Sequence, residues 1–265
     1  MLFRTMNNCF RITDDRFSAE HTDLYDLTFE VQFTRLRFVV RSGGQLIGLE
    51  DHFLGYSNDI STCERAITAL LETHPILSIR FWKTVKLISD LQIHTLVPSA
   101  QFKAENAPKY LELTFPTADM QELELVTETI HHQTLVSGTV RSVNTIFRDR
   151  YPDLTLTSAL AVGLNHFSRL DTAVTMGVIS ETFFDLYYLN TKNKMRMVIK
   201  SPLRNLAQLT GPDLLLYGEI TPYSRSYHQL KSQFRSLVLG EITEALPEKF
   251  SELPPQRYFT LLAGS

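Results

Sequence analysis

The sequence predicts a mixed α/β protein built from two similar units. Each unit opens with three short segments in which apolar and polar residues alternate, first between Leu27 and Phe53 and again between Val174 and Ile199. Alternation with a period of two is typical of strands that bury one face. In neither unit does a glycine-rich phosphate loop join the segments. We therefore expect a duplicated sheet-and-helix fold that lacks the usual nucleotide-binding residues.

The first unit is expected to begin as an antiparallel meander. Its three strands are predicted at 27–33, 36–40 and 46–52. Ser42-Gly43-Gly44-Gln45 separates the second strand from the third and supplies the positive-φ residues that a tight hairpin needs. We prefer this explanation of the glycine pair to a phosphate cradle.

A helix is predicted directly after the meander. Ser61 and Glu64 form a capping box at its start. The apolar residues between 63 and 71 fall on one face, and Pro75 prevents continuation. The rest of the unit is expected to contain strands at 85–89, 94–97, 123–130 and 134–136, and helices at 106–115 and 140–147.

The second unit is expected to follow a buried connecting helix. Residues 159–167 are nearly all small or apolar, which suits a helix packed between two lobes. We place the boundary just after it, so that residues 1–170 form the first lobe with the connecting helix and residues 171–265 form a shortened second lobe. The second lobe is predicted to contain strands at 174–178, 184–188 and 195–199, turns at 180–181 and 191–193, a brief helical turn at 203–209, a strand at 214–217, a helix beginning near Ser224 and a strand at 237–242. Prolines 247, 254 and 255 are expected to break the tail.

Composition excludes a disulfide-rich protein and a strongly basic one. The 265 residues are 43% hydrophobic, which is ample for a buried core in each lobe. Basic and acidic residues number 26 and 29, so no global field attracts nucleic acid or anionic lipid. Only Cys9 and Cys63 are present, which excludes a disulfide framework. Because neither a signal peptide nor a membrane-spanning stretch is evident, we expect a soluble cytoplasmic protein.

Four stretches resemble a bacterial family of unknown function whose structural representatives have an actin-like ATPase fold. The stretches are His94–Phe102 with Lys109–Leu111, Phe184–Asn190, Leu215–Ile220 with Ser226–Leu230, and Pro255–Leu261. The doubled order of elements is also similar to that of the actin and sugar-kinase superfamily. The resemblance implies two ribonuclease-H-like lobes in an actin-like ATPase arrangement. It does not assign an activity, because none is known for the family. Before Leu214 the chain departs from the family pattern, because a longer aromatic-rich helix is reduced to about two turns.

The phosphate-binding residues that this resemblance would imply are missing. Actin-like ATPases hold phosphates with an Asp- and Gly-rich hairpin between the first two strands of each lobe, since only glycine lets backbone N–H groups approach phosphate closely. Here the turns are Gln32-Phe33-Thr34-Arg35 and Ser180-Glu181-Thr182-Phe183, and we expect Phe33 and Phe183 to occupy the phosphate positions. The adenosine side usually has paired glycines, whereas Tyr217-Gly218-Glu219 offers one. We predict no cofactor, no metal and no catalytic residue.

Carboxylates and histidines provide the alternative catalytic hypotheses. A ribonuclease-H-like nuclease needs several carboxylates converging on two metal ions. Asp26 and Asp90 are the only plausible pair, with Glu50 or Asp51 as a third, and we favour solvated strand-end acids instead. His131-His132 is expected to lie on a strand, where neighbouring side chains point to opposite faces and do not readily bind one metal ion.

Arginines and tyrosines provide candidate contacts with partners. Arg35, Arg37 and Arg41 share one strand face, and Arg141 and Arg148 lie along one helix. Such faces can hold RNA phosphate, although a solvated face is the favoured explanation in a chain with an acidic total. Four tyrosines offer a protein interface that core packing explains equally well; they are Tyr187, Tyr188, Tyr223 and Tyr227.

The leading hypothesis is a noncatalytic protein of actin-like fold. It acts as a binding or assembly factor with a protein partner and without membrane contact. The alternatives are a diverged ATP-binding or ATP-hydrolysing protein and an RNA-associated protein.

Overall fold

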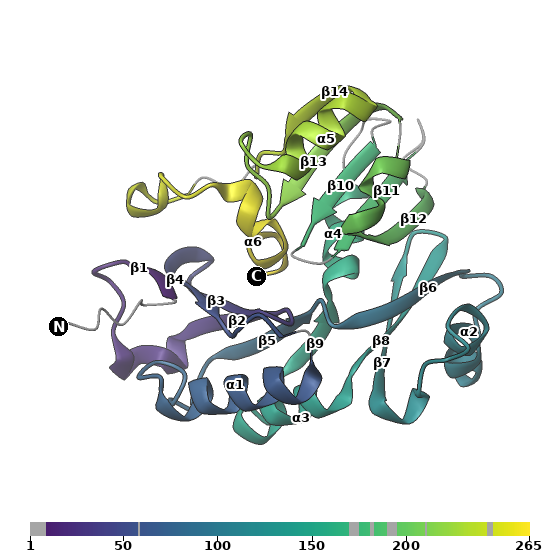
Figure 1. Cartoon of the computed structure of the whole chain (residues 1–265). Coiled ribbons are helices and arrows are strands. Elements are labelled where there is room, and N and C mark those ends of the chain that lie inside the picture. The colour runs from purple at the N-terminus through teal and green to yellow at the C-terminus, as the bar shows by residue number, and fades with distance from the viewer. Residues whose placement is uncertain are drawn as a thin grey trace. The chain divides into compact units, whose positions relative to one another are not determined.

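The chain forms two compact units, which we describe separately (Figure 1). A computed structural model describes residues 9–57, 59–169, 175–180, 183–189, 195–209, 211–242 and 246–265. The first unit comprises Met1–Ala159, Leu246–Glu252 and Gly264–Ser265, and the second comprises Leu160–Ala245 and Leu253–Ala263. In this division most of the connecting helix belongs to the second unit, and two parts of the tail belong to the first.

The main sheet of the first unit has six strands in the order β1-β4-β3-β2-β5-β9. They are β1 (Cys9–Thr13), β2 (Tyr25–Val31), β3 (Arg35–Ser42), β4 (Gln45–Phe53), β5 (Thr84–Ser89) and β9 (Thr155–Ser158). The expected antiparallel meander is confirmed as β2, β3 and β4, and β5 and β9 then add in parallel. The sequence interpretation missed β1, an edge strand that pairs with β4, and the four-residue β9.

Two helices cover one face of this sheet, α1 (Ile60–Thr73) and α3 (Arg141–Arg150), which lie side by side in Figure 1. Their apolar stripes pack on alternate residues of β2 and β3, including Phe29 and Phe38. The predicted capping box of Ser61 and Glu64 is wrong. Asp59 caps α1 instead, because its carboxylate accepts the Thr62 N–H at 2.9 Å.

A separate three-stranded antiparallel sheet completes the first unit. It has the order β6-β8-β7 and is covered by α2 (Ala107–Thr114); its strands are β6 (Gln92–Pro98), β7 (Leu123–Ile130) and β8 (Gln133–Val140). His131 and His132 form the turn between β7 and β8 rather than part of a strand, and His131 has a positive φ of 55°. Short 3-10 helices occupy Ala19–Leu24, Ala104–Asn106, Met120–Glu122 and Glu248–Phe250.

The sheet of the second unit repeats the topology of the first. Its order is β12-β11-β10-β13-β14, with β10 (Thr175–Ile179), β11 (Phe183–Leu189), β12 (Met195–Pro202), β13 (Gly211–Gly218) and β14 (Phe234–Leu239). Three antiparallel strands are again followed by two parallel ones. The predicted turn at 191–193 lies outside the described residues. Apart from the additional edge strand β1, the two sheets have the same order, which confirms that the fold is duplicated.

Helices cover both faces of the second sheet. The 3-10 helix η4 (Leu203–Gln208) and α5 (Arg225–Gln233) cover one face, and η4 is as short as the sequence predicted. On the other face, the rings of Phe167 in α4 (Ala159–Phe167) and Phe259 in α6 (Phe259–Gly264) pack against Tyr217 of β13, and the 3-10 helix η6 (Pro255–Tyr258) contacts the same strand. The sequence interpretation missed α6. Among the described residues, no helix is long and apolar enough to cross a membrane.

Candidate functional site

The turn between β2 and β3 is where the resemblance to actin-like ATPases predicts a phosphate site in the first unit. The Gln32 N–H donates to the Arg35 carbonyl at 2.9 Å, which closes a short connection without glycine. Phe33 follows the alternation of β2 and packs against the hydrophobic core of the unit. Its ring thus contacts the core, and its occupation of a phosphate position stays a prediction. Gln32 and Thr34 are both buried.

Buried charges lie behind this turn, on the sheet face opposite α1. Arg37 is 1% exposed, and Glu30 and Asp51 from the neighbouring strands are 3% and 2% exposed. Arg37 Nη1 lies 3.6 Å from Glu30 Oε2, and Arg37 Nε lies 3.3 Å from Asp51 Oδ2. Arg35 adds a second ion pair to Asp51 at 2.9 Å. Because registered strands place these residues opposite one another, the network is part of the sheet itself.

The electrostatics of this network are unfavourable to an additional anion. Burial raises the pKa of Glu30, the adjacent Arg37 opposes that effect, and the charge of Asp90 adds to it. The Gln32 amide donates to the other Glu30 oxygen at 3.0 Å. Glu30 and Asp51 thus already balance the positive charge of Arg37. A phosphate brought to this face would meet buried acids rather than backbone N–H groups.

The corresponding turn of the second unit joins β10 to β11. Ser180 and Phe183 close it, since the Ser180 N–H donates to the Phe183 carbonyl at 2.9 Å. Lys200 lies over the Phe183 ring, 4.9 Å from its centroid, and forms an ion pair with Asp185 at 3.4 Å. Residues 181 and 182 lie outside the described residues. Lys200 is therefore engaged by a ring and a carboxylate.

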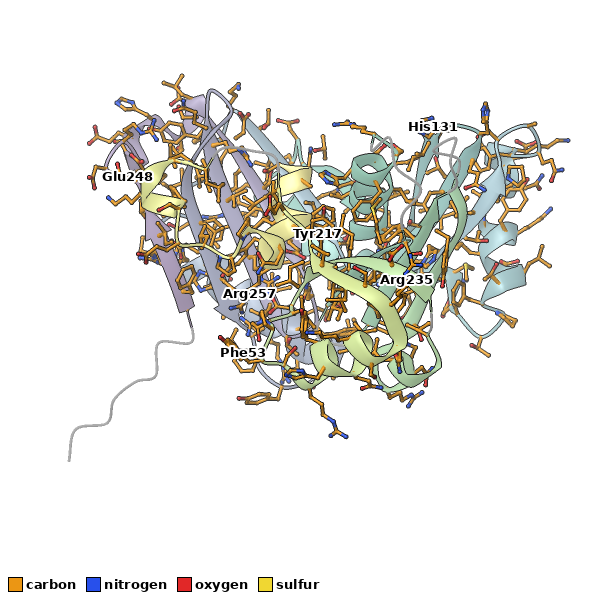
Figure 2. The ribbon with its side chains drawn as sticks, turned by 90° about the horizontal axis from the view of Figure 1, so that it is seen from above. Phe53, His131, Tyr217, Arg235, Glu248 and Arg257 are labelled. Carbon is orange, nitrogen blue, oxygen red and sulfur yellow. The ribbon has the colours of Figure 1, made fainter. Side chains whose placement is uncertain are left out.

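The end of β13 is the third position of interest, because the adenosine side would lie there. Gly218 has a φ of +94°, and a Cβ at this position would lie 1.9 Å from the Ile179 carbonyl oxygen. That oxygen also accepts the Glu219 N–H at 2.7 Å. Gly218 is thus required for close packing of two backbones. Glu219 pairs with Arg257 of the tail at 3.1 Å, and Tyr217 stacks near Phe259 with centroids 4.4 Å apart (Figure 2, where Tyr217 and Arg257 are labelled).

Comparisons with known proteins identify the family. A family model described as "Protein of unknown function (DUF3822)" matches residues 14–196, which is more than half of the chain. The chain belongs to this family. A comparison with curated proteins finds no match.

Solved structures show that this DUF3822 chain has an actin-like ATPase fold. A Bacteroides thetaiotaomicron protein with that fold and unknown function is 12% identical, with a TM-score of 0.74 over 93% of this chain and 97% of the other. A chain of the PilM-PilN type IV pilus biogenesis complex is 13% identical, with a TM-score of 0.53 over 90% of this chain and 96% of the other. Both the predicted fold class and the predicted resemblance are confirmed.

The carboxylates considered for a nuclease do not converge in the DUF3822 chain. Asp26 is the second residue of β2, whereas the Asp90 N–H donates to the carbonyl of Val31 at the other end of that strand. From Asp26 to Val31 there are five residue steps along the strand, which is about 17 Å at 3.3 Å per residue. Asp26 is instead paired with Lys83 at 3.1 Å. A two-metal site needs its ions about 4 Å apart, so this pair cannot form one.

The five arginines proposed as partner contacts all bond within the chain. Arg35 and Arg37 belong to the buried network, and Arg41 donates to the Gly44 carbonyl at 2.8 Å. Arg141 donates to the Gln121 carbonyl at 3.1 Å, and Arg148 pairs with both oxygens of Glu124. These bonds give no support to an RNA-binding role. Their use by a protein partner stays a prediction.

The sequence interpretation missed a group of potential metal ligands in the first unit. Cys9 of β1 lies beside Glu50 and His52 of β4, and the three ligand atoms are within 4.8 Å of one another. The sequence did contain one signal. Glu50 and His52 are two residues apart on a predicted strand, so their side chains point to the same face. Cys9 was not recognised because β1 was not predicted.

Proposed function

We propose that this protein is a noncatalytic binding or assembly factor that uses an actin-like ATPase fold without binding ATP. The single observation that carries the proposal is the buried network of Glu30, Arg37 and Asp51, which lies behind the first phosphate-position turn. In this proposal the fold is a scaffold for a protein partner.

The network argues against nucleotide binding because the positive charge of Arg37 is already paired with two carboxylates. Phosphate sites in proteins rely on backbone N–H groups, helix N-termini or unengaged cations. At this turn the Gln32 N–H is bonded to the Arg35 carbonyl, and the Gln32 amide is bonded to Glu30. Moving a triphosphate next to buried carboxylates would add repulsion in a region of low dielectric, where charges interact strongly.

The end of β13 supports the same proposal. Gly218 is used for the approach of two backbones, and the following Glu219 is paired with Arg257 of the tail. Gly240 leaves room for the Tyr217 ring, since a Cβ there would lie 2.1 Å from it. Aromatic and charged side chains of the same unit thus occupy the neighbourhood where an adenosine would need space.

A protein partner is the remaining element of the proposal. One structural neighbour belongs to a complex named for type IV pilus biogenesis, so this fold occurs in at least one protein assembly. At 13% identity the neighbour shows the fold alone, and its partner is not transferred to this chain.

A titration of the purified full chain with Mg-ATP tests the proposal. A ligand that binds only the folded state must stabilise it, by about 2.7 kcal/mol at a hundred times the dissociation constant. We expect no shift of the melting temperature at millimolar Mg-ATP, Mg-ADP or Mg-GTP, while an established actin-like ATPase in the same plate shows a clear shift. Saturable stabilisation by Mg-ATP, with a stoichiometry near one by calorimetry, would overturn the proposal.

A further inference from the structure

The edge of the first sheet gathers a sulfur, a nitrogen and an oxygen at one point. Cys9 Sγ lies 3.6 Å from His52 Nε2 and 3.8 Å from Glu50 Oε2. His52 Nε2 lies 2.8 Å from the same Glu50 oxygen. Register explains the convergence, because Cys9 pairs directly with His52 and Arg11 with Glu50. All of these residues belong to the first unit.

The geometry is not that of a nucleophilic cysteine. A Cys-His-Glu triad needs one imidazole nitrogen on the thiol and the other on the carboxylate. Here Cys9 and Glu50 both approach Nε2 of His52. One nitrogen cannot take the thiol proton while donating to the acid, so the arrangement does not relay a proton.

The separations match those between ligands of a tetrahedral zinc ion. Bond lengths of about 2.3 Å to sulfur, 2.05 Å to nitrogen and 2.1 Å to oxygen place tetrahedral ligand atoms about 3.4 to 3.6 Å apart. Two of the three observed separations lie within about 0.2 Å of this range. The third, between His52 Nε2 and Glu50 Oε2, has the length of a hydrogen bond whose proton an ion would replace.

The crowding of donors around Glu50 Oε2 is a second observation. Four donors approach this single oxygen, because His74 Nε2 lies at 3.1 Å and Arg11 Nη2 at 3.0 Å in addition to His52 and the Cys9 thiol. A carboxylate oxygen has about two acceptor positions. One divalent cation bound by Cys9, Glu50 and His52 would replace two of the four protons and leave His74 and Arg11 as the remaining donors.

His74 and Arg11 are placed to hold Glu50 rather than to bind the ion. His74 Nδ1 accepts the backbone N–H groups of Ile76 and Leu77, each at 3.3 Å, which assigns the proton to Nε2. Nε2 then donates to Glu50 Oε2 at 3.1 Å and meets a second donor, Arg11 Nη2, at 2.6 Å. Arg11 Nε lies 2.7 Å from Glu50 Oε1, the oxygen on the other side of the carboxylate. Metal-binding carboxylates are usually held in this way by hydrogen bonds from outside the ligand set.

We propose that Cys9, Glu50 and His52 bind one zinc ion whose fourth position is open to water or an external ligand. The donor set of thiolate, imidazole and carboxylate suits Zn²⁺, whereas Mg²⁺ and Ca²⁺ prefer oxygen alone. The ion would join the edge strand β1 to β4 and, through Glu50 and His74, to the end of α1. This inference is independent of whether the chain binds nucleotide.

Cobalt and zinc titrations of the reduced, chelator-stripped full chain test the proposal. We expect Co²⁺ to bind with a stoichiometry of one and to give a thiolate-to-cobalt charge-transfer band that Zn²⁺ abolishes. Cys9→Ala should remove the band and weaken Zn²⁺ binding, measured against a chromogenic chelator, by more than about 100-fold, because even loss of a surrounding partner costs 10- to 100-fold. His52→Gln should have the same effect on affinity.

Cys63→Ala is the matched control, because Cys63 is the other cysteine of the chain and lies buried on α1. It should keep both the band and the affinity. The circular dichroism spectrum of Cys9→Ala should match that of the parent chain, since Cys9 belongs to a five-residue edge strand. Absence of stoichiometric binding in the parent chain, or equal binding in Cys9→Ala and the parent, would overturn the proposal.

Discussion

Replacing Arg37 with methionine tests whether the buried network behaves as the structure indicates. The substitution keeps an unbranched side chain of similar length but removes the cation that lies between Glu30 and Asp51. Asp51 retains Arg35 at 2.9 Å, so the carboxylate left without its ion-pair partner is Glu30. We therefore expect the loss of stability to depend on the protonation of Glu30.

The magnitude follows from the cost of protonating that carboxyl. A buried glutamate without a cation binds a proton rather than remain charged, which costs at most about 1.36 kcal/mol for each pH unit above a reference pKa of about 4.3. The ceiling is about 3.7 kcal/mol at pH 7 and about 1 kcal/mol at pH 5. Burial already raises the pKa of Glu30 in the parent chain, so part of this cost is present there. We expect Arg37→Met to lose about 2–3 kcal/mol at pH 7.

The sign of the pH dependence is opposite to that of an ordinary ion-paired acid. A carboxyl whose pKa is raised on folding binds more protons in the folded state, so the folded state gains stability as the pH falls towards its unfolded pKa. The deficit of Arg37→Met should therefore shrink to less than about 1 kcal/mol at pH 5.

Urea unfolding followed by tryptophan fluorescence is the suitable assay. Trp82 is the only tryptophan of the chain and packs against the core of the first unit. The double variant Glu30→Gln/Arg37→Met is the control, and its stability should differ little between pH 5 and pH 7. A deficit for Arg37→Met that is the same at both pH values would refute the reasoning.

Two further predictions concern the backbone. Gly218→Ala should destabilise the second unit by more than about 3 kcal/mol, because the methyl group meets the Ile179 carbonyl, and hydrogen exchange should accelerate in β10. Gly44→Ala is its control, since Gly44 also has a positive φ of +82° but has open space around it, so about 1–2 kcal/mol is expected and β10 should be unaffected. Asp59→Ala should cost about 1 kcal/mol in urea unfolding because it removes the cap of α1, whereas Glu64→Ala should change stability by less than about 0.5 kcal/mol; a larger loss for Glu64 would restore the original capping box.

The elements that the sequence predicted well are those with long, regular patterns. The meanders, α1, α3 and α5 each contain several periodic apolar residues, and a capping residue or proline limits some of them. The missed strands β1 and β9 have five and four residues, too few for a period to emerge. The cap of α1 was misplaced because Asp59 and Ser61 are both good caps, and only backbone geometry selects between them.

The site residues were harder to predict because their partners come from distant strands. The shared face of Arg35, Arg37 and Arg41 follows from alternation within one strand. Their burial does not, because it requires the register that places Arg37 opposite both Glu30 and Asp51. Charged residues are mostly exposed, so a sequence interpretation assigns such a face to solvent unless the opposing carboxylates are known.

The buried acids on the two faces of β4 are paired with different kinds of arginine. Glu50, Asp51 and His52 are consecutive and all buried, although buried charges rarely stabilise a fold more than apolar residues of similar volume. On one face Asp51 is held by Arg35 and Arg37, of which Arg37 is buried. On the other face the charge of Glu50 is balanced in part by Arg11, whose side chain is 48% exposed on an edge strand. Asp51 already lies beside two arginines, whereas Glu50 has one that is partly exposed, so an added cation is expected at Glu50 rather than at Asp51.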